Sequence, residues 1–166
     1  SFFQLYLNFI MKSNFERMLQ LADDVFASKN DPEQLDVNES VLEGLTRIHP
    51  ASIAEYDDGN GPVAWVLIFP TTKKLMQLFL EKEISEKQLF ESTPIGTAYE
   101  VIYLCSAMVL QEYRSQGIAT RLAIDSIEQI RKDHVIEGLF VWAFTIEGER
   151  LANQLADALS LPIYFR

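Results

Sequence analysis

One sequence feature constrains this chain most: a long apolar segment that leads directly into a glycine-containing turn and an amphipathic helix. Residues 99–110 are nearly all apolar, which is typical of a strand buried on both faces of a sheet. The stretch from Tyr113 to Ile124 that follows has two arginines, Arg114 and Arg121, and no carboxylate, although the chain has 24 acids and 14 bases. Gly117 permits a close backbone approach, and the unpaired amides and dipole of a helix start favour an anion. We therefore predict a phosphate-binding turn between a central strand and a helix.

Composition limits the classes of protein and partner. A chain of 166 residues with 48% hydrophobic content is long enough for one compact domain, which we predict to be α/β. The net charge of −10 argues against nucleic-acid binding and favours positively charged or amine-bearing partners. The lone Cys105 excludes an internal disulfide and a cysteine-rich zinc site, so we expect no bound metal. We also expect a cytoplasmic location. No motif places His49 or His134 beside Cys105, which predicts a buried, inert thiol.

The first ten residues are strongly apolar and precede Met11. They are too short to span a bilayer and lack the charged start of a signal peptide, so no membrane segment is predicted. Residues 1–10 are interpreted as an extension that is not native, with a single domain over residues 11–166. The alternative is a genuine first strand or helix turn packed on the core.

Hydrophobic periodicity and turn formers predict the remaining elements. We expect helices over 13–27, 39–47 and 149–159, a hairpin of strands 51–56 and 63–69, and later strands over 139–144 and 161–165. The charged segment 71–96 has two interpretations. It forms one or two solvated surface helices, or it covers a substrate pocket.

The turn resembles a known cofactor motif. Arg114, Gly117 and Ala119 satisfy the pattern Q/R-x-x-G-x-G/A, and residues 109–119 resemble the acyl-CoA-binding motif of the GNAT superfamily of N-acetyltransferases. The order of elements from Met11 onward is also similar to that family. The resemblance implies an α/β (α+β) fold with a mixed, mostly antiparallel central sheet, flanking helices and splayed central strands. A doubly wound nucleotide-binding domain is disfavoured, because its glycine loop would follow the first strand.

The resemblance also implies a cofactor site for acetyl-CoA as cosubstrate. The pyrophosphate would be held by the backbones of Arg114, Ser115, Gln116, Gly117, Ile118 and Ala119, with a hydroxyl from Thr120. The pantetheine arm would pair with the backbone of Met108 and Val109, whose main-chain groups are left free where the strands splay. The structural alternative is that Gly117 merely permits tight packing of the helix on the sheet.

The catalytic residues are less clear from the resemblance. Ala156 stands about where family members often have a tyrosine acid, and Glu149 near the place of a frequent asparagine. The position of a family glutamate base falls on Tyr103, with Glu100 on the other face unless a bulge corrects the register. Tyr103 could donate a proton, and Glu100 or Glu147 could accept one through water. The alternatives are that Tyr103 is a core aromatic, Glu100 a strand-edge charge and Glu147 a helix-start carboxylate.

Two functions are consistent with these residues. The first is an N-acetyltransferase that moves an acetyl group from acetyl-CoA to a primary amine of a small molecule or peptide by direct transfer. The second is a non-catalytic CoA-binding or protein-interaction module, suggested by the missing tyrosine and asparagine. Family members commonly finish with a two-stranded hairpin, whereas this sequence stops soon after residues 161–165, which leaves a homodimer open.

Overall fold

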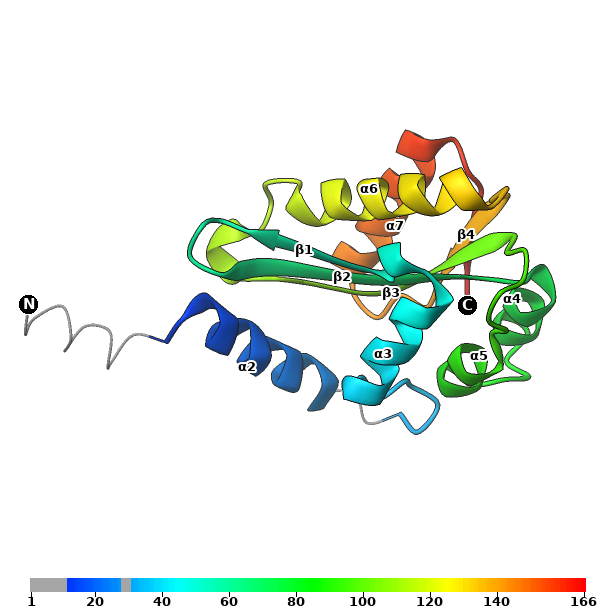
Figure 1. Ribbon diagram of the computed structural model, residues 1–166, viewed down its shortest axis with the longest axis horizontal. Coiled ribbons are helices and arrows are strands. Elements are labelled where there is room, and N and C mark those ends of the chain that lie inside the picture. Colours follow the sequence, from blue (N-terminus) through cyan, green and yellow to red (C-terminus); the bar gives the residue numbers. More distant parts are fainter. Residues whose placement is uncertain (1–11, 28–30) are drawn as a thin grey trace, which may run out of the picture.

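The chain forms one mixed sheet with helices on both faces (Figure 1). The computed structural model describes residues 12–27 and 31–166, so the predicted extension over 1–10 and Met11 lie outside the described residues. The helices are α2 (Asn14–Ala27), α3 (Glu39–Ile48), α4 (Lys73–Leu80), α5 (Glu86–Ser92), α6 (Ile118–Asp133) and α7 (Ile146–Leu159), with 3-10 turns η1 (Pro50–Ser52) and η2 (Gln111–Tyr113). The strands are β1 (Ile53–Asp57), β2 (Pro62–Thr71), β3 (Val101–Val109), β4 (Gly138–Val141) and β5 (Ile163–Phe165).

The five strands follow one another across the sheet in chain order. The pairs β1–β2 and β2–β3 are antiparallel, whereas β3–β4 and β4–β5 are parallel because α6 and α7 act as crossovers. The mixed α/β fold with flanking helices is therefore confirmed. The antiparallel pairs β1–β2 and β2–β3 are longer than the parallel ones, so the predicted mostly antiparallel sheet is confirmed as well.

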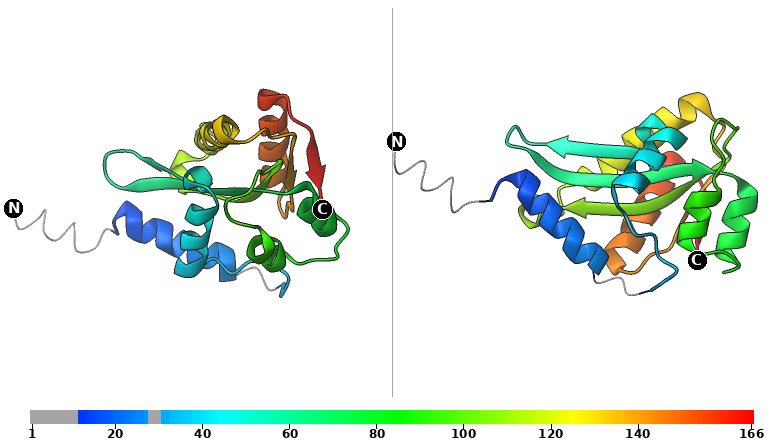
Figure 2. Two further views of the ribbon diagram at one scale, coloured as in Figure 1. Left: turned by 45° about the vertical axis from the view of Figure 1, so that its right-hand side comes forward. Right: turned by 60° about the horizontal axis from the view of Figure 1, so that its bottom comes forward.

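Alternation along the strands divides the core between the two faces (Figure 2). On one face, α6 and α7 bury Ile127 and Leu155 against Ile68 and Ile102. On the other face, α3, α4 and α5 cover a cluster that includes Tyr103, and α2 covers a smaller one at the far end of β2 and β3. The segment 71–96 thus forms two helices that close the core, since Phe79 of α4 and Leu89 of α5 are completely buried in that cluster.

The two central strands diverge, as predicted. β3 pairs with β4 only from Val101 to Leu104, and in the described part of the chain the rest of β3 has no strand partner on that side. β4 ends at Val141, so the predicted strand 139–144 is shorter than expected and residues 142–145 form a loop. A β-bulge lies at the same level, because Leu67 pairs with Ser106 while Ile68 pairs with Leu104. Cys105 is therefore the extra residue of β3 where the splay begins.

Candidate functional site

The predicted phosphate turn has a backbone that depends on left-handed residues. Ser115 and Gly117 have φ values of 62° and 77°, a region that glycine adopts without steric cost. A Cβ added to Gly117 would meet nothing within 4 Å, so close packing of the helix on the sheet is not why glycine stands here. Gly117 instead presents open space at the start of α6.

The start of α6 differs from that of the other helices. The described α-helices other than α6 each have a side-chain cap, from Ser13, Asn38, Thr72, Ser85 and Thr145 respectively. Gly117 gives α6 no side-chain cap, and its first turn has no acid. The first amides of α6 are therefore available to an anion, together with the positive end of the helix dipole.

Two long-range contacts hold the turn in place. Arg17 of α2 forms a bidentate ion pair with Glu112 at 2.5 and 2.8 Å, and this hydrogen bond lowers the pKa of Glu112 to about 2. The Tyr113 hydroxyl donates a hydrogen bond to Asp58 in the β1–β2 turn, which lowers the pKa of Asp58 and raises that of Tyr113. Asn14 donates to the other oxygen of Asp58 at 3.2 Å. The turn is thus anchored to α2 and to the hairpin before α6 begins.

The last residues of β3 present main-chain groups to the splay. The Leu110 amide bonds the Val63 carbonyl at 2.9 Å, and main-chain groups alternate in direction along a strand. The groups of Met108 therefore face β2, whereas those of Ala107 and Val109 face away from β2 into the splay. The Val109 carbonyl accepts a hydrogen bond from Arg114 Nε at 3.0 Å, which draws the predicted arginine back over the strand end. The Thr120 hydroxyl bonds Gln154 of α7 at 3.3 Å.

The two predicted catalytic residues lie in different places. Tyr103 is completely buried beside the end of the β3–β4 pairing, and its hydroxyl donates to the carboxyl group of Glu86, which is 3% exposed. Burial raises the pKa of Tyr103 well above its usual value, with the nearby Glu86 as a further cause. Glu100 precedes β3, nine residues and about 30 Å along the strand from Val109. Its carboxylate accepts a hydrogen bond from the Lys73 amide at the start of α4.

The other residues singled out in the sequence have structural contacts. Glu147 is exposed in the first turn of α7, and Ala156 is buried on the same helix. His49 bonds Asp133 and the Ala51 amide, His134 bonds the Tyr99 amide, and the two rings are 6.0 Å apart.

Several residues at the site had no sequence signal. The guanidinium of Arg166 lies 4.4 Å from the ring centroids of both Phe79 and Trp142, and bonds Glu33 at 3.3 Å. Trp142 directly follows β4, so this stack forms one side of the splay. Glu86, Arg17 and Asp58 were also missed, because their partners are 17, 95 and 55 residues away and no local pattern links such distant positions.

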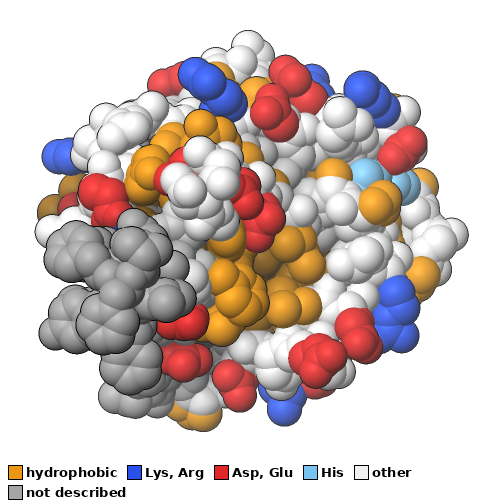
Figure 3. Space-filling model, turned by 60° about the vertical axis from the view of Figure 1, so that its left-hand side comes forward, with side chains coloured by type: hydrophobic (Ala, Val, Ile, Leu, Met, Phe, Trp, Pro, Cys, Tyr) orange, Lys and Arg blue, Asp and Glu red, His pale blue; other side chains and the backbone are white. Residues whose placement is uncertain are grey.

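One face of the molecule is apolar at its centre. Figure 3 shows hydrophobic side chains gathered near the middle of this face, with acidic side chains around them. Within residues 12–27 and 31–166, no group of His, Cys, Asp and Glu could hold a metal ion. In the same residues, the helices all lack the length and apolar character needed to cross a bilayer.

The geometry agrees with a comparison to protein families. The model of the acetyltransferase (GNAT) family matches residues 15–154, which covers the sheet up to β4 and most of α7. The chain belongs to the acetyltransferase (GNAT) family. It is therefore an acetyl-transferring enzyme, and GNAT enzymes generally use acetyl-CoA. The predicted family is confirmed over all the elements that frame the splay and the α6 start.

Other comparisons give more distant similarities. No match was found among the curated proteins. One similar solved structure is an aminoglycoside acetyltransferase from an uncultured soil metagenomic sample in complex with trehalose, with 16% identity, TM-score 0.46, and coverage of 84% of this chain and 76% of that one. Another is a ribosomal-protein-alanine N-acetyltransferase from Brucella melitensis biovar Abortus 2308, with 16% identity, TM-score 0.47, and coverage of 86% and 81%.

Proposed function

We propose that this GNAT protein transfers an acetyl group from acetyl-CoA to a primary amine of a small molecule or peptide, by direct transfer in a ternary complex. The observation that carries the proposal is the uncapped start of α6, which opens through Gly117 onto free space at the end of a strand with one unpaired edge. A phosphate group at the helix start and an extended arm along β3 match these two features.

The directions of the main-chain groups of β3 support the proposed cofactor site. The amides from Ser115 to Ala119 would surround the pyrophosphate, because the Arg114 amide already donates to the Gln111 carbonyl at 3.2 Å. The guanidinium of Arg114 would add positive charge while it bonds the Val109 carbonyl. The pantetheine amides would bond the strand edge at Ala107 and Val109. The thioester would then lie near the bulge at Cys105, where β3 and β4 separate.

The chemistry requires a proton to leave the amine and another to reach the sulfur. Transfer forms a C–N bond and breaks the C–S bond, so the attacking amine loses one proton and the thiolate gains one. Tyr103 is the better placed of the two predicted catalytic residues, because it lies next to the splay and stays neutral, hydrogen-bonded to Glu86. Glu100 lies at the opposite end of β3 from Val109, where its carboxylate accepts a hydrogen bond from the Lys73 amide. The geometry therefore favours Tyr103 over Glu100.

Gly117→Glu tests the cofactor site, and Gly96→Glu is its matched control. Both glycines have similar left-handed φ values, 77° and 74°, and an added Cβ would meet nothing within 4 Å at either position. Each substitution should therefore cost a similar ~1–2 kcal/mol of folding free energy. Calorimetry should show that Gly117→Glu loses acetyl-CoA binding and Gly96→Glu retains it. Equal affinities for the two variants would refute the site.

The non-catalytic alternative keeps the same cofactor site and lacks turnover. Release of free CoA thiol across a panel of amines and peptides separates the two functions, because only an enzyme produces it. Tight acetyl-CoA binding without turnover over a broad panel would favour the interaction module. The cytoplasmic location and the homodimer remain predictions from the sequence.

A further inference from the structure

The guanidinium of Arg166 is a buried cation beside the splay. Its side chain is only 2% exposed, and the group lies 4.4 Å from the ring centroids of both Phe79 of α4 and Trp142 after β4. The Arg166 amide donates to the carbonyl of Val141, the last residue of β4, at 3.0 Å. A guanidinium stacks well on aromatic rings, and such contacts gain strength where water is excluded. Arg166 therefore joins α4 to the end of β4, at the level where β3 and β4 separate.

One nitrogen of this guanidinium has a charged partner and another has none. Nη2 bonds both carboxylate oxygens of Glu33 at 3.3 Å, whereas Nη1 is buried without an acceptor in the part of the chain that the structure describes. A buried charge with an unpaired donor is unfavourable for folding, so stability alone does not account for an arginine here. A side chain that is 2% exposed is also too enclosed to bind a substrate itself. These two facts point to an effect of Arg166 on a neighbouring group.

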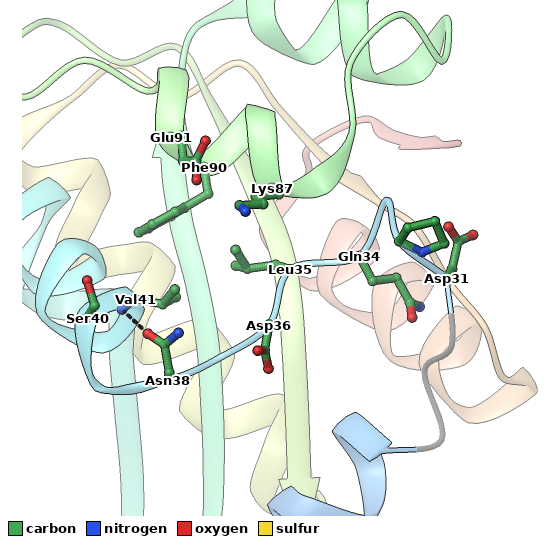
Figure 4. Close-up of a pocket in the computed structure, with 11 residues that line it drawn as sticks. Asp31, Gln34, Leu35, Asp36, Asn38, Ser40, Val41, Lys87, Phe90 and Glu91 are labelled. Carbon is green, nitrogen blue, oxygen red and sulfur yellow. Dashed lines mark hydrogen bonds between the residues drawn. The ribbon is translucent and has the colours of Figure 1, made fainter.

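A chain of hydrogen bonds connects Arg166 to Tyr103. Glu33 pairs with Arg166 through its carboxylate, and its carbonyl accepts a hydrogen bond from the Glu86 amide at 2.9 Å. The carboxyl group of Glu86 then accepts from the Leu35 amide at 2.6 Å and from the Tyr103 hydroxyl. Figure 4 shows the α2–α3 loop beside α5, around a hollow of about 630 Å³ whose lining includes no residue of the splay. The hydrogen-bonded chain, and not the hollow, therefore links this loop to Tyr103.

Ring contacts and charge give a second connection. The Phe79 ring meets that of Tyr103 edge to face, with the centroids 5.2 Å apart, and Phe140 of β4 packs on both rings at 6.0 and 4.9 Å. Burial, the largest cause, raises the pKa of the Tyr103 hydroxyl, and the positive charge of Arg166 acts against it. Without this cation, Tyr103 would be a weaker acid, and Phe79 would lose the contact that fixes its outer face.

We propose that Arg166 is a positioning residue for acetyl transfer and acts through Tyr103. This inference rests on the proposed function, in which Tyr103 handles a proton. As the C–S bond breaks, its electron pair goes to the sulfur, the Tyr103 hydroxyl gives its proton to that sulfur, and negative charge develops on the phenolic oxygen. The proton that the amine releases after the C–N bond forms returns Tyr103 to its neutral state. The fixed guanidinium stabilises the developing charge and holds the ring cluster in place.

A double-mutant cycle between Arg166→Met and Tyr103→Phe tests this proposal in the full chain, with an amine that the parent acetylates. Arg166→Met should lower kcat about 10- to 100-fold and leave the KM for acetyl-CoA unchanged, because the charge and the ring position are both lost. In the Tyr103→Phe background, the same substitution should change kcat by less than about twofold.

Two further variants separate charge from packing. Arg166→Lys keeps the positive charge but cannot stack on two rings, so it should recover part of the kcat that Arg166→Met loses. Arg131→Met is the matched control. The Arg131 guanidinium bonds the Leu159 carbonyl at 3.3 Å on the α6 and α7 side of the sheet, and the variant should keep the kcat of the parent.

The outcomes distinguish this inference from the proposed function. If the parent releases CoA thiol with no amine, the proposed function fails and this inference fails with it. If the parent is active and Arg166→Met lowers kcat equally in both backgrounds, Arg166 has only a structural role and this inference alone is refuted. An unchanged kcat in a folded Arg166→Met or Tyr103→Phe variant refutes it as well. If Arg166→Met does not fold, the cycle with Arg166→Lys decides, through a fall in kcat of about two- to tenfold that disappears in Tyr103→Phe.

Discussion

At the scale of single residues, the buried pair of Tyr103 and Glu86 is the most informative contact near the splay. Tyr103→Phe removes a hydrogen bond to a carboxyl group that is 3% exposed, which should cost about 1–3 kcal/mol of stability. If Tyr103 also handles a proton in transfer, kcat should fall by about 10²-fold or more. Thermal unfolding and steady-state kinetics measure the two effects separately.

Tyr99→Phe is the matched control for this prediction. Tyr99 is 3% exposed and its hydroxyl donates to the Pro94 carbonyl at 2.6 Å, outside the site. The Tyr99→Phe variant should lose some folding stability and keep the kcat of the parent. If Tyr103→Phe also keeps its kcat at a temperature where both variants are folded, Tyr103 is a core aromatic and no proton donor.

The site residues differ in how far the sequence could predict them. Gly117 was singled out from a local pattern of strand, turn and helix, and its left-handed backbone is consistent with that pattern. Glu86 was not, because it lies in the charged segment 71–96 and meets Tyr103 and Leu35 only in the folded chain. The predicted position of Glu100 depended on counting residues back along the strand from the turn. The bulge at Cys105 adds one residue to β3, which changes the face assigned by such a count without changing the apolar pattern.

At the scale of elements, the free edge of β3 can be tested with two proline substitutions. The Ala107 amide faces the splay, whereas the Ser106 amide faces β2, where Ser106 pairs with Leu67. Both prolines fix φ in the same way, but only Ser106→Pro removes a ladder hydrogen bond, at a cost of about 1–3 kcal/mol.

The two variants should therefore separate stability from cofactor binding. Ala107→Pro should stay the more stable in thermal unfolding, yet bind acetyl-CoA about two- to tenfold more weakly, since one ligand-facing donor is lost. Acetyl-CoA affinity measured by calorimetry provides the second readout. Unchanged affinity in a folded Ala107→Pro variant would place the pantetheine arm elsewhere.

Element order and type were largely predictable, whereas element ends were not. Apolar runs and turn formers located the hairpin and the long strand. The end of β4 at Val141 was missed, because Trp142 and Phe144 continue the apolar run while their rings stack 4.6 Å apart in a loop. Thr145 caps α7, which begins three residues earlier than periodicity indicated.

At the scale of the whole molecule, three distant segments meet at the turn before α6. Arg17 of α2 bonds Glu112, and Asp58 of the β1–β2 turn bonds both Tyr113 and Asn14. Both carboxyl groups have lowered pKa values because they accept these hydrogen bonds. A carboxylate with a lowered pKa stabilises the folded state above its unfolded pKa, and this stabilisation is lost as pH falls through the folded value.

This linkage predicts the pH range in which the contact between Arg17 and Glu112 stops stabilising the folded chain. For Glu112 the stabilisation should be complete above about pH 4.5 and disappear towards about pH 2. Glu112→Gln should therefore have a lower Tm than the parent at pH 7, and the difference should vanish near pH 2. Glu128→Gln, an exposed carboxylate of α6 with no partner among the described residues, should follow the parent at every pH. A difference between Glu112→Gln and the parent that stays constant from pH 7 to pH 2 would show that the ion pair with Arg17 does not hold the turn in place.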